Sequence, residues 1–195
     1  MLGIFLDTET NGLDAYKHRV LEIALKIVDL ATEEIKGEYH SIIAQPENIW
    51  GISDLESLKI NGFTWEKILQ GKTEKQVADE ILALFYRIKI SRNGAVFICQ
   101  NPSFDKAFFS QLIPIYTQET LNWPYHWLDL ASMYWAVSMD KAKTEKKAFP
   151  WETGFSKDII ASCYELPKES KPHKAMNGVD HLILCYKAVI GFPFQ

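Results

Sequence analysis

Apolar and polar positions divide the chain into strands in its first quarter and a mixture of helices and strands after it. Residues 2–6 form an unbroken apolar run, which is typical of a strand buried on both faces. Two further apolar runs, 20–29 and 38–44, are separated by turn-forming residues. Together the three runs predict an antiparallel meander.

The rest of the chain predicts alternating helices and strands. Apolar residues at positions 77, 81, 84, 85 and 88 have the spacing of one helix face, which predicts a helix over 72–90. A lysine-rich stretch over 141–147 predicts an exposed loop. Strands that precede alternating helices and strands favour an α/β domain with a mixed sheet. The other expected elements are strands at 95–99 and 127–129, and helices from Asp105 to before Pro114, from Phe155, and over 179–190.

Length and charge narrow the class of protein. The 195 residues predict a single domain over 1–195, and 47% hydrophobic and 24% charged residues exclude a disordered chain. The 25 acidic residues exceed the 21 basic ones, giving a net charge of −4. This excess argues against nucleic-acid binding by bulk charge, so any contact with phosphate must be local.

The cysteines and the apolar runs predict a cytoplasmic protein that does not enter a membrane. Cys99, Cys163 and Cys185 are widely spaced and follow neither a disulfide nor a zinc pattern, which favours a reducing compartment. The apolar start of the chain is too short for a signal peptide, and no apolar run approaches the roughly 18 residues of a membrane span.

Two acidic residues stand at the end of the first predicted strand. Side chains alternate along a strand, so Asp7 and Glu9 point to the same face. Two carboxylates ~5 Å apart repel each other by about 3 kcal/mol at an effective dielectric constant near 20, which favours a bound proton or cation. Hard carboxylate oxygens suit Mg²⁺ or Mn²⁺. The alternative is a solvated strand end.

Other candidate groups lie further along the chain. Asp105 follows the strand at 95–99 at the mouth of a helix, where it could face the same crevice as Asp7 or serve as the helix N-cap. His173 and Asp180 lie before and on the last predicted helix, giving a base beside a fourth carboxylate. A single loop histidine is more often incidental than catalytic.

These residues resemble the three motifs of the DnaQ-like, DEDDh-type 3′-5′ exonucleases. The matching segments are Asp7-Thr8-Glu9-Thr10-Asn11-Gly12-Leu13, then Asn101 with Phe104-Asp105, then His173-x-Ala175 followed by an acid. Similar landmarks at 19–24, 60–64 and 127–129 extend the resemblance over essentially the whole chain. The resemblance implies a ribonuclease H-like fold, with a five-stranded mixed sheet flanked by helices. It also implies hydrolysis of phosphodiesters from the 3′ end of single-stranded DNA or RNA, releasing nucleoside 5′-monophosphates.

The resemblance also implies roles for individual residues. Asp7 would bridge two divalent ions, Mg²⁺ or Mn²⁺, with Glu9 and Asp180 completing one site and Asp105 serving the other. His173 would be the general base, because an imidazole with a pKa near 6.5 accepts protons at neutral pH. The residues expected to contact the substrate are Thr10, Leu13, Phe63, Asn101 and Phe108.

One position departs from the family pattern. The last acid usually follows the histidine by five residues, where this chain has Gly178, and Asp180 lies two residues later. Either a helix break at Gly178 lets Asp180 take the role, which we expect, or the fourth ligand is missing. His181 is the reserve candidate for the base. A catalytically impaired nucleic-acid-binding or polymerase-associated module is therefore the alternative function.

The partners expected are single-stranded DNA or RNA 3′ ends. Association with a polymerase or with a second copy of the chain is also open. The motifs do not choose between DNA and RNA, because contacts to the 2′-hydroxyl cannot be located from the sequence.

Overall fold

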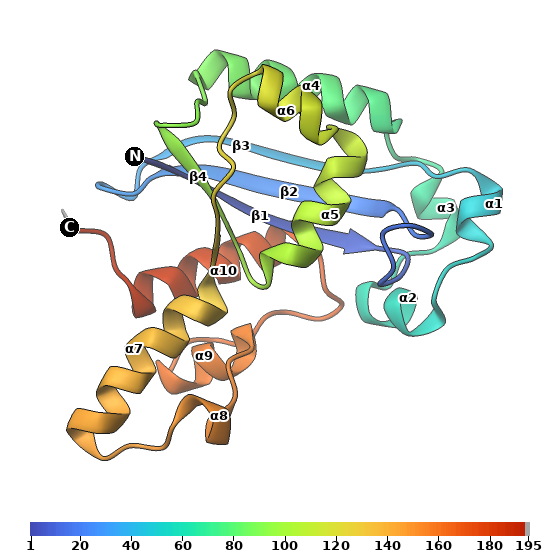
Figure 1. Cartoon of the computed structure of the whole chain (residues 1–195). Coiled ribbons are helices and arrows are strands. Elements are labelled where there is room, and N and C mark those ends of the chain that lie inside the picture. The colour runs from blue at the N-terminus through green and yellow to red at the C-terminus, as the bar shows by residue number, and fades with distance from the viewer. Residues whose placement is uncertain (194–195) are drawn as a thin grey trace.

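A five-stranded mixed sheet lies at the centre of the structure (Figure 1). The computed structural model describes residues 1–193. The strand order is β3-β2-β1-β4-β5, with β1–β2 and β2–β3 antiparallel and β1–β4 and β4–β5 parallel. The predicted meander and the five-stranded mixed sheet are confirmed. The strands are β1 (Leu2–Thr10), β2 (Val20–Asp29), β3 (Ile35–Ile42), β4 (Ala95–Cys99) and β5 (Trp127–Asp129).

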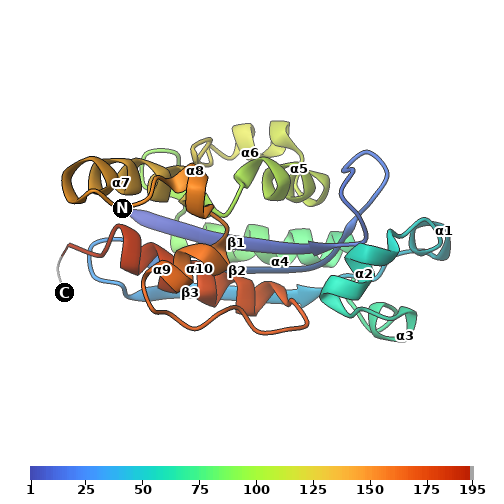
Figure 2. The same cartoon turned by 90° about the horizontal axis from the view of Figure 1, so that it is seen from below.

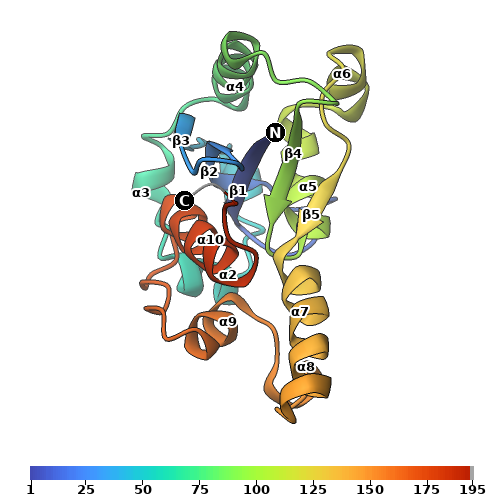
Figure 3. The ribbon, with the colours of Figure 1, turned by 90° about the vertical axis from the view of Figure 1, so that its left-hand side faces the viewer.

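Helices cover both faces of the sheet. In Figures 1 and 3, α4, α5 and α6 lie on one side, and α7, α9 and α10 lie on the other. The short helices α1, α2 and α3 lie beyond the end of β1, as Figure 2 shows. The helices are α1 (Glu47–Trp50), α2 (Leu55–Asn61), α3 (Trp65–Ile68), α4 (Glu74–Ile88), α5 (Pro102–Leu112), α6 (Ile115–Thr120), α7 (Leu130–Glu145), α8 (Pro150–Thr153), α9 (Lys157–Cys163) and α10 (Ala175–Val189).

Strand β1 divides the core into two layers. Ile4 and Leu6 pack with α4 and α5, whereas Phe5, between them, packs with residues of α7, α9 and α10. All three side chains are fully buried, as expected for a strand covered on both faces. Continuing this alternation places Asp7 and Glu9 on the side of α10. The hydrophobic packing of β1 therefore fixes the direction of the two acids.

Several elements differ from the predicted ones. The stretch 141–147 is largely helical, because α7 continues to Glu145 from an N-cap at Asp129. Only three of the sixteen α7 residues are buried, so its apolar pattern was too weak to predict a helix. Helix α10 begins at Ala175, four residues earlier than predicted, and runs without a break through Gly178. Within residues 1–193, no helix combines the length and apolar character that crossing a bilayer requires.

Candidate active site

Three carboxylates converge near the carboxyl ends of two parallel strands. Asp7 and Glu9 lie near the end of β1, and Asp105 lies in the first turn of α5, which follows β4 directly. The Thr8 hydroxyl donates a 2.8 Å hydrogen bond to Asp105 Oδ1 and ties α5 to β1. The N-cap of α5 is Asn101, in the left-handed region with φ 58°, so Asp105 does not cap the helix. Its carboxylate is free for another role.

Burial weakens the acidity of all three carboxyls, and the charge of Asp7 adds to this effect at Glu9 and Asp105. Burial, then the charge of Asp7, raises the pKa of Glu9 from 4.5 to about 8. Burial is also the largest reason that the pKa of Asp7 is raised, and burial followed by the charge of Asp7 raises the pKa of Asp105 well above 3.8. Such a cluster is stabilised by protons or by a cation. The site therefore favours the binding of a proton or a cation.

One lysine supplies part of this positive charge, although no motif or spacing in the sequence pointed to it. Lys157, the first residue of α9, places Nζ 3.1 Å from Asp7 Oδ1 and 3.0 Å from Glu169 Oε2. Its side chain is 14% exposed. Burial by itself would lower the pKa of Lys157, but the charges of Asp7 and Glu169 outweigh burial and raise it. Lys157 is thus a fixed cation at Asp7.

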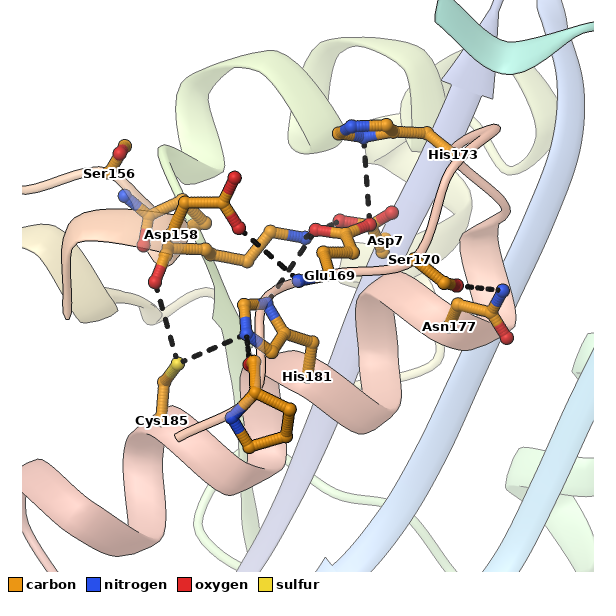
Figure 4. Close-up of polar contacts among 12 residues, drawn as sticks. Asp7, Ser156, Asp158, Glu169, Ser170, His173, Asn177, His181 and Cys185 are labelled. Carbon is orange, nitrogen blue, oxygen red and sulfur yellow. Dashed lines mark hydrogen bonds and ion pairs between the residues drawn. The ribbon is translucent and has the colours of Figure 1, made fainter. Parts of the chain in front are cut away.

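Glu169 lies behind Lys157 in the loop before α10, between two histidines (Figure 4). His173 Nδ1 lies 3.6 Å from Glu169 Oε1, and His181 Nδ1 lies 3.7 Å from Oε2. Although burial opposes it, contact with His181 and the charge of Lys157 lower the pKa of Glu169 to about 2. Contacts with Cys185 and Glu169 raise the pKa of His181 to about 10. Within residues 1–193, Glu169 Oε1 has no hydrogen-bond partner.

The structure does not bring Asp180 to the other carboxylates. Because α10 is unbroken, Asp180 lies about 200° around the helix from Gly178, at about 100° per residue. It is half exposed and pairs with Lys26 of β2. Gly178 instead faces Asp7, and a Cβ built on it would lie 2.2 Å from Asp7 Oδ2. The predicted helix break and the placement of Asp180 among the ligands are therefore wrong.

Replacing Asp180 tests this correction. We expect Asp180→Ala to leave the exonuclease turnover that the sequence resemblance implies within about twofold of wild type, because its carboxylate lies on the Lys26 side of α10. Its loss removes an ion pair in which the Asp180 side chain is 51% exposed and the Lys26 side chain 15%, but Glu38 Oε2 still lies 3.9 Å from Lys26 Nζ. Steady-state turnover of the purified variant checks this. A loss of tenfold or more would restore Asp180 to the site.

The two histidines occupy different environments. The His173 side chain is one-third exposed and lines a surface groove with Lys59, Ile60 and Pro172. Its backbone N–H donates to the Ile60 carbonyl at 3.1 Å, which holds this loop against α2. His181 is buried, with Nε2 2.9 Å from the Pro167 carbonyl oxygen. Only His173 is placed to meet a substrate from solution.

The five predicted substrate contacts separate by exposure. Leu13 is 74% exposed and Asn101 is also exposed, so both can be reached from solution. Thr10 is buried, and its hydroxyl donates to the Gly12 carbonyl at 2.7 Å. Phe63 is almost fully buried under the Lys174 ammonium, which lies 3.6 Å from its ring centre. Phe108 is fully buried on the inward face of α5, so its prediction as a nucleotide contact is wrong.

The donor set fits a divalent ion, although not a complete four-carboxylate cage. Within residues 1–193, no three His, Cys, Asp or Glu side chains are already arranged around a common metal position. Asp7, Glu9 and Asp105 nevertheless offer hard oxygen donors in a buried cluster that repels itself. Small side-chain rotations around an entering cation would relieve that repulsion. The three carboxylates are consistent with Mg²⁺ or Mn²⁺.

Solved nuclease structures share the fold of this chain. Exonuclease I of E. coli in complex with a dT13 oligonucleotide superposes with a TM-score of 0.76 at 16% identity, covering 98% of this chain and 41% of that one. Cell-death related nuclease 4 superposes with a TM-score of 0.70 at 14% identity, covering 98% of this chain and 65% of that one. The nuclease domain of 3′hExo, a DEDDh family member bound to rAMP, superposes with a TM-score of 0.68 at 11% identity, covering 100% of this chain and 94% of that one.

The chain spans less than two thirds of the first two of these structures, so their whole-protein activities are not carried over. No curated protein sequence matches it. At such low identities the structures show the ribonuclease H-like fold alone. The family assignment comes from the RNase_T family model, described as an exonuclease, which matches residues 4–180. The match includes Asp7, Glu9, Asp105 and His173, and the chain therefore belongs to the RNase_T exonuclease family.

Proposed function

We propose that this chain is a metal-dependent 3′-5′ exonuclease that removes nucleotides from the 3′ end of single-stranded DNA or RNA. The observation that carries the proposal is the convergence of the buried Glu9 and Asp105 carboxylates with the mostly buried Asp7 carboxylate near the end of the sheet. A groove-lining histidine lies on the adjacent loop. The expected products are nucleoside 5′-monophosphates.

Asp7, Glu9 and Asp105 would hold the divalent cation. When bound, such an ion lowers the pKa of water and stabilises the charge that develops on the phosphate. The three carboxylates would position the ion, and the hydrogen bond from the Thr8 hydroxyl holds the Asp105 carboxylate in place. Glu9 and Asp105 are buried and the Asp7 side chain is mostly buried, which strengthens their interaction with a cation.

His173 would accept the proton of the attacking water. Glu169 Oε1 lies 3.6 Å from Nδ1 of this imidazole, slightly longer than a hydrogen bond, and closing this gap when substrate binds would leave Nε2 as the proton acceptor. The pair therefore has the order of a base and the carboxylate that orients it.

Replacing His173 should separate catalysis from metal binding. We expect His173→Ala to lower turnover at least about a hundredfold, the usual contribution of a general base, while Mn²⁺ affinity stays within about twofold. Single-turnover assays and manganese titration measure the two effects. His126→Ala is the matched control, since His126 packs against Tyr125 next to β5. Turnover within threefold of wild type in His173→Ala would remove His173 from the mechanism.

The proposed substrate is a single-stranded 3′ end of DNA or RNA. The E. coli neighbour was solved with a dT13 oligonucleotide, and a 3′-exonuclease neighbour is described as recognising the 3′ end of a histone mRNA stem-loop. These neighbours support single-stranded ends as the substrate class and leave the sugar open. Matched DNA and RNA oligomers of several lengths would choose between them. Size-exclusion chromatography tests whether the chain forms a homodimer, and mixing with a polymerase tests that association, both of which the sequence leaves open.

A second candidate is supported by one specific observation. Gly178 stands where the family places an acid, and Lys157 already pairs with Asp7. A chain that had lost catalysis would keep the fold and bind nucleic acid without cleaving it. This non-catalytic module is the alternative function.

A 5′-labelled single strand with a free 3′ hydroxyl separates the two candidates. Incubation with Mg²⁺ should give a ladder of products shortened from the 3′ end, and incubation with chelator should leave the strand intact. Asp7→Asn serves as the inactive control. An intact strand that binds the protein measurably in Mg²⁺ and in Mn²⁺ would favour the module instead.

The cytoplasmic location remains part of the proposal. Cys99, Cys163 and Cys185 are all free thiols, and Cys99 and Cys185 are buried. Free thiols are compatible with a reducing compartment. Fractionation of cells that express the protein tests the location.

A further inference from the structure

We propose that the Lys157 ammonium replaces one of the two divalent ions, so that the active site binds a single ion. This inference rests on the proposed function and concerns how that site is charged. Its evidence is the position of Lys157 and the missing side chain at Gly178.

The Lys157 ammonium is held in place from several directions. It stands at the start of α9, where the Ser156 side chain caps the helix by accepting from the Ile159 N–H. Its carbonyl oxygen accepts a 3.8 Å contact from Cys185 Sγ on α10. Its Nζ reaches both Asp7 and Glu169. A mostly buried lysine with two carboxylate partners is a built-in cation rather than a mobile surface charge.

Gly178 leaves room for Asp7 in this arrangement. A Cβ at position 178 would lie 2.2 Å from Asp7 Oδ2 and 2.6 Å from Cγ, so a side chain there would displace the Asp7 carboxylate. The Asp7 side chain can adopt the rotamer that contacts Lys157 only because position 178 has no side chain. The same helix turn cannot offer a fourth ligand while Asp7 holds this position.

The change of charge matches one divalent ion. Loss of an acid at 178 removes one negative charge, and Lys157 adds one positive charge, a difference of two units. Once all three are ionised around a cation, Asp7, Glu9 and Asp105 carry three negative charges beside one lysine, which leaves two for a single divalent cation to balance. Glu169 lies behind Lys157 and faces His173 and His181 on its other side. Its charge reaches Asp7 and Glu9, and the buried His181 imidazole, 3.7 Å from Glu169 Oε2, offsets it without a metal ion.

A competing arrangement uses Glu169 as the fourth ligand. Glu169 is almost fully buried, and its Oε1 has no hydrogen-bond partner within residues 1–193. If Lys157 moved outward, Glu169 and Asp7 would both be freed to bind a second ion. The two arrangements therefore differ in the number of ions bound per chain.

Counting bound Mn²⁺ distinguishes them. Equilibrium dialysis of the full chain, with free Mn²⁺ followed by electron paramagnetic resonance, should give one ion per chain. Lys157→Met removes the ammonium but keeps an unbranched side chain, and it should raise the count to two because Asp7 and Glu169 become available. Lys157→Arg keeps the charge and should stay at one. Lys26→Met, which removes the lysine that pairs with Asp180, is the matched control and should also stay at one.

The outcomes keep this inference apart from the proposed function. Two ions in the wild-type chain would overturn the inference and leave the exonuclease proposal standing, whereas no bound ion would count against both. One ion in folded Lys157→Met, checked by its melting curve, would contradict the role of Lys157. If Lys157→Met does not fold, the wild-type and Lys157→Arg counts decide, since two ions in either overturns the inference.

Discussion

Asp7→Asn is expected to reduce nuclease turnover at least about a thousandfold. Asp7 contacts Lys157, faces Gly178 and contributes charge to both Glu9 and Asp105. Replacing one carboxylate oxygen by an amide weakens cation binding and disturbs the whole cluster. At about 1.4 kcal/mol per tenfold in rate, a thousandfold loss is about 4 kcal/mol of transition-state stabilisation.

The measurement is single-turnover cleavage of a labelled strand at saturating Mg²⁺, with the melting temperature as a check on folding. Asp79→Asn is the matched control, because Asp79 pairs with Lys75 on the exposed side of α4 and should show wild-type rates. A folded Asp7→Asn protein that keeps more than a tenth of wild-type turnover would contradict the proposed site.

Glu9 should make the metal-free protein lose stability as the pH rises. Its pKa is about 8 in the folded chain, mainly because of burial, against an ordinary value of 4.5. A carboxyl with a raised pKa stabilises the fold fully below its unfolded pKa, and this contribution is lost as the pH rises through the folded pKa. The difference between 8 and 4.5, at 1.36 kcal/mol per pKa unit, sets the loss at about 5 kcal/mol at most.

Chemical denaturation in chelator from pH 5 to pH 9 measures this loss. Glu9→Gln should flatten the fall in the free energy of unfolding, and Mg²⁺ or Mn²⁺ should oppose it by binding the folded state. Glu56→Gln, at an exposed position of α2, is the matched control and should keep the wild-type slope. If the free energy of unfolding falls equally with pH in wild type and in Glu9→Gln, Glu9 is not the group responsible for the loss of stability.

The sequence predicted the residues that strand geometry controls. The apolar run before Asp7 required a buried strand, and the alternation of side chains then placed Asp7 and Glu9 on one face. The parallel pairing of β1 and β4 brought Asp105 to them, as expected for residues that follow neighbouring parallel strands. Local pattern and topology were sufficient for these three acids.

Residues placed by tertiary packing were not predictable in this way. Lys157 and Glu169 meet Asp7 only because α9 and the following loop fold back over the sheet. Asp180 was misplaced because the continuity of α10 depends on Ala175, Val179 and Leu182 packing into the core, which overrides the flexibility of Gly178. Phe108 was misassigned because an aromatic residue near a motif gives no indication of which side of its helix faces inward.

The most direct test uses linear and circularised copies of one single strand, with released products identified by mass spectrometry. The linear copy should release nucleoside 5′-monophosphates in Mg²⁺ or Mn²⁺. The circular copy, and either copy in chelator, should release no product. Cleavage of the circle, release of 3′-monophosphates, or no release by the folded protein would contradict a metal-dependent 3′-5′ exonuclease.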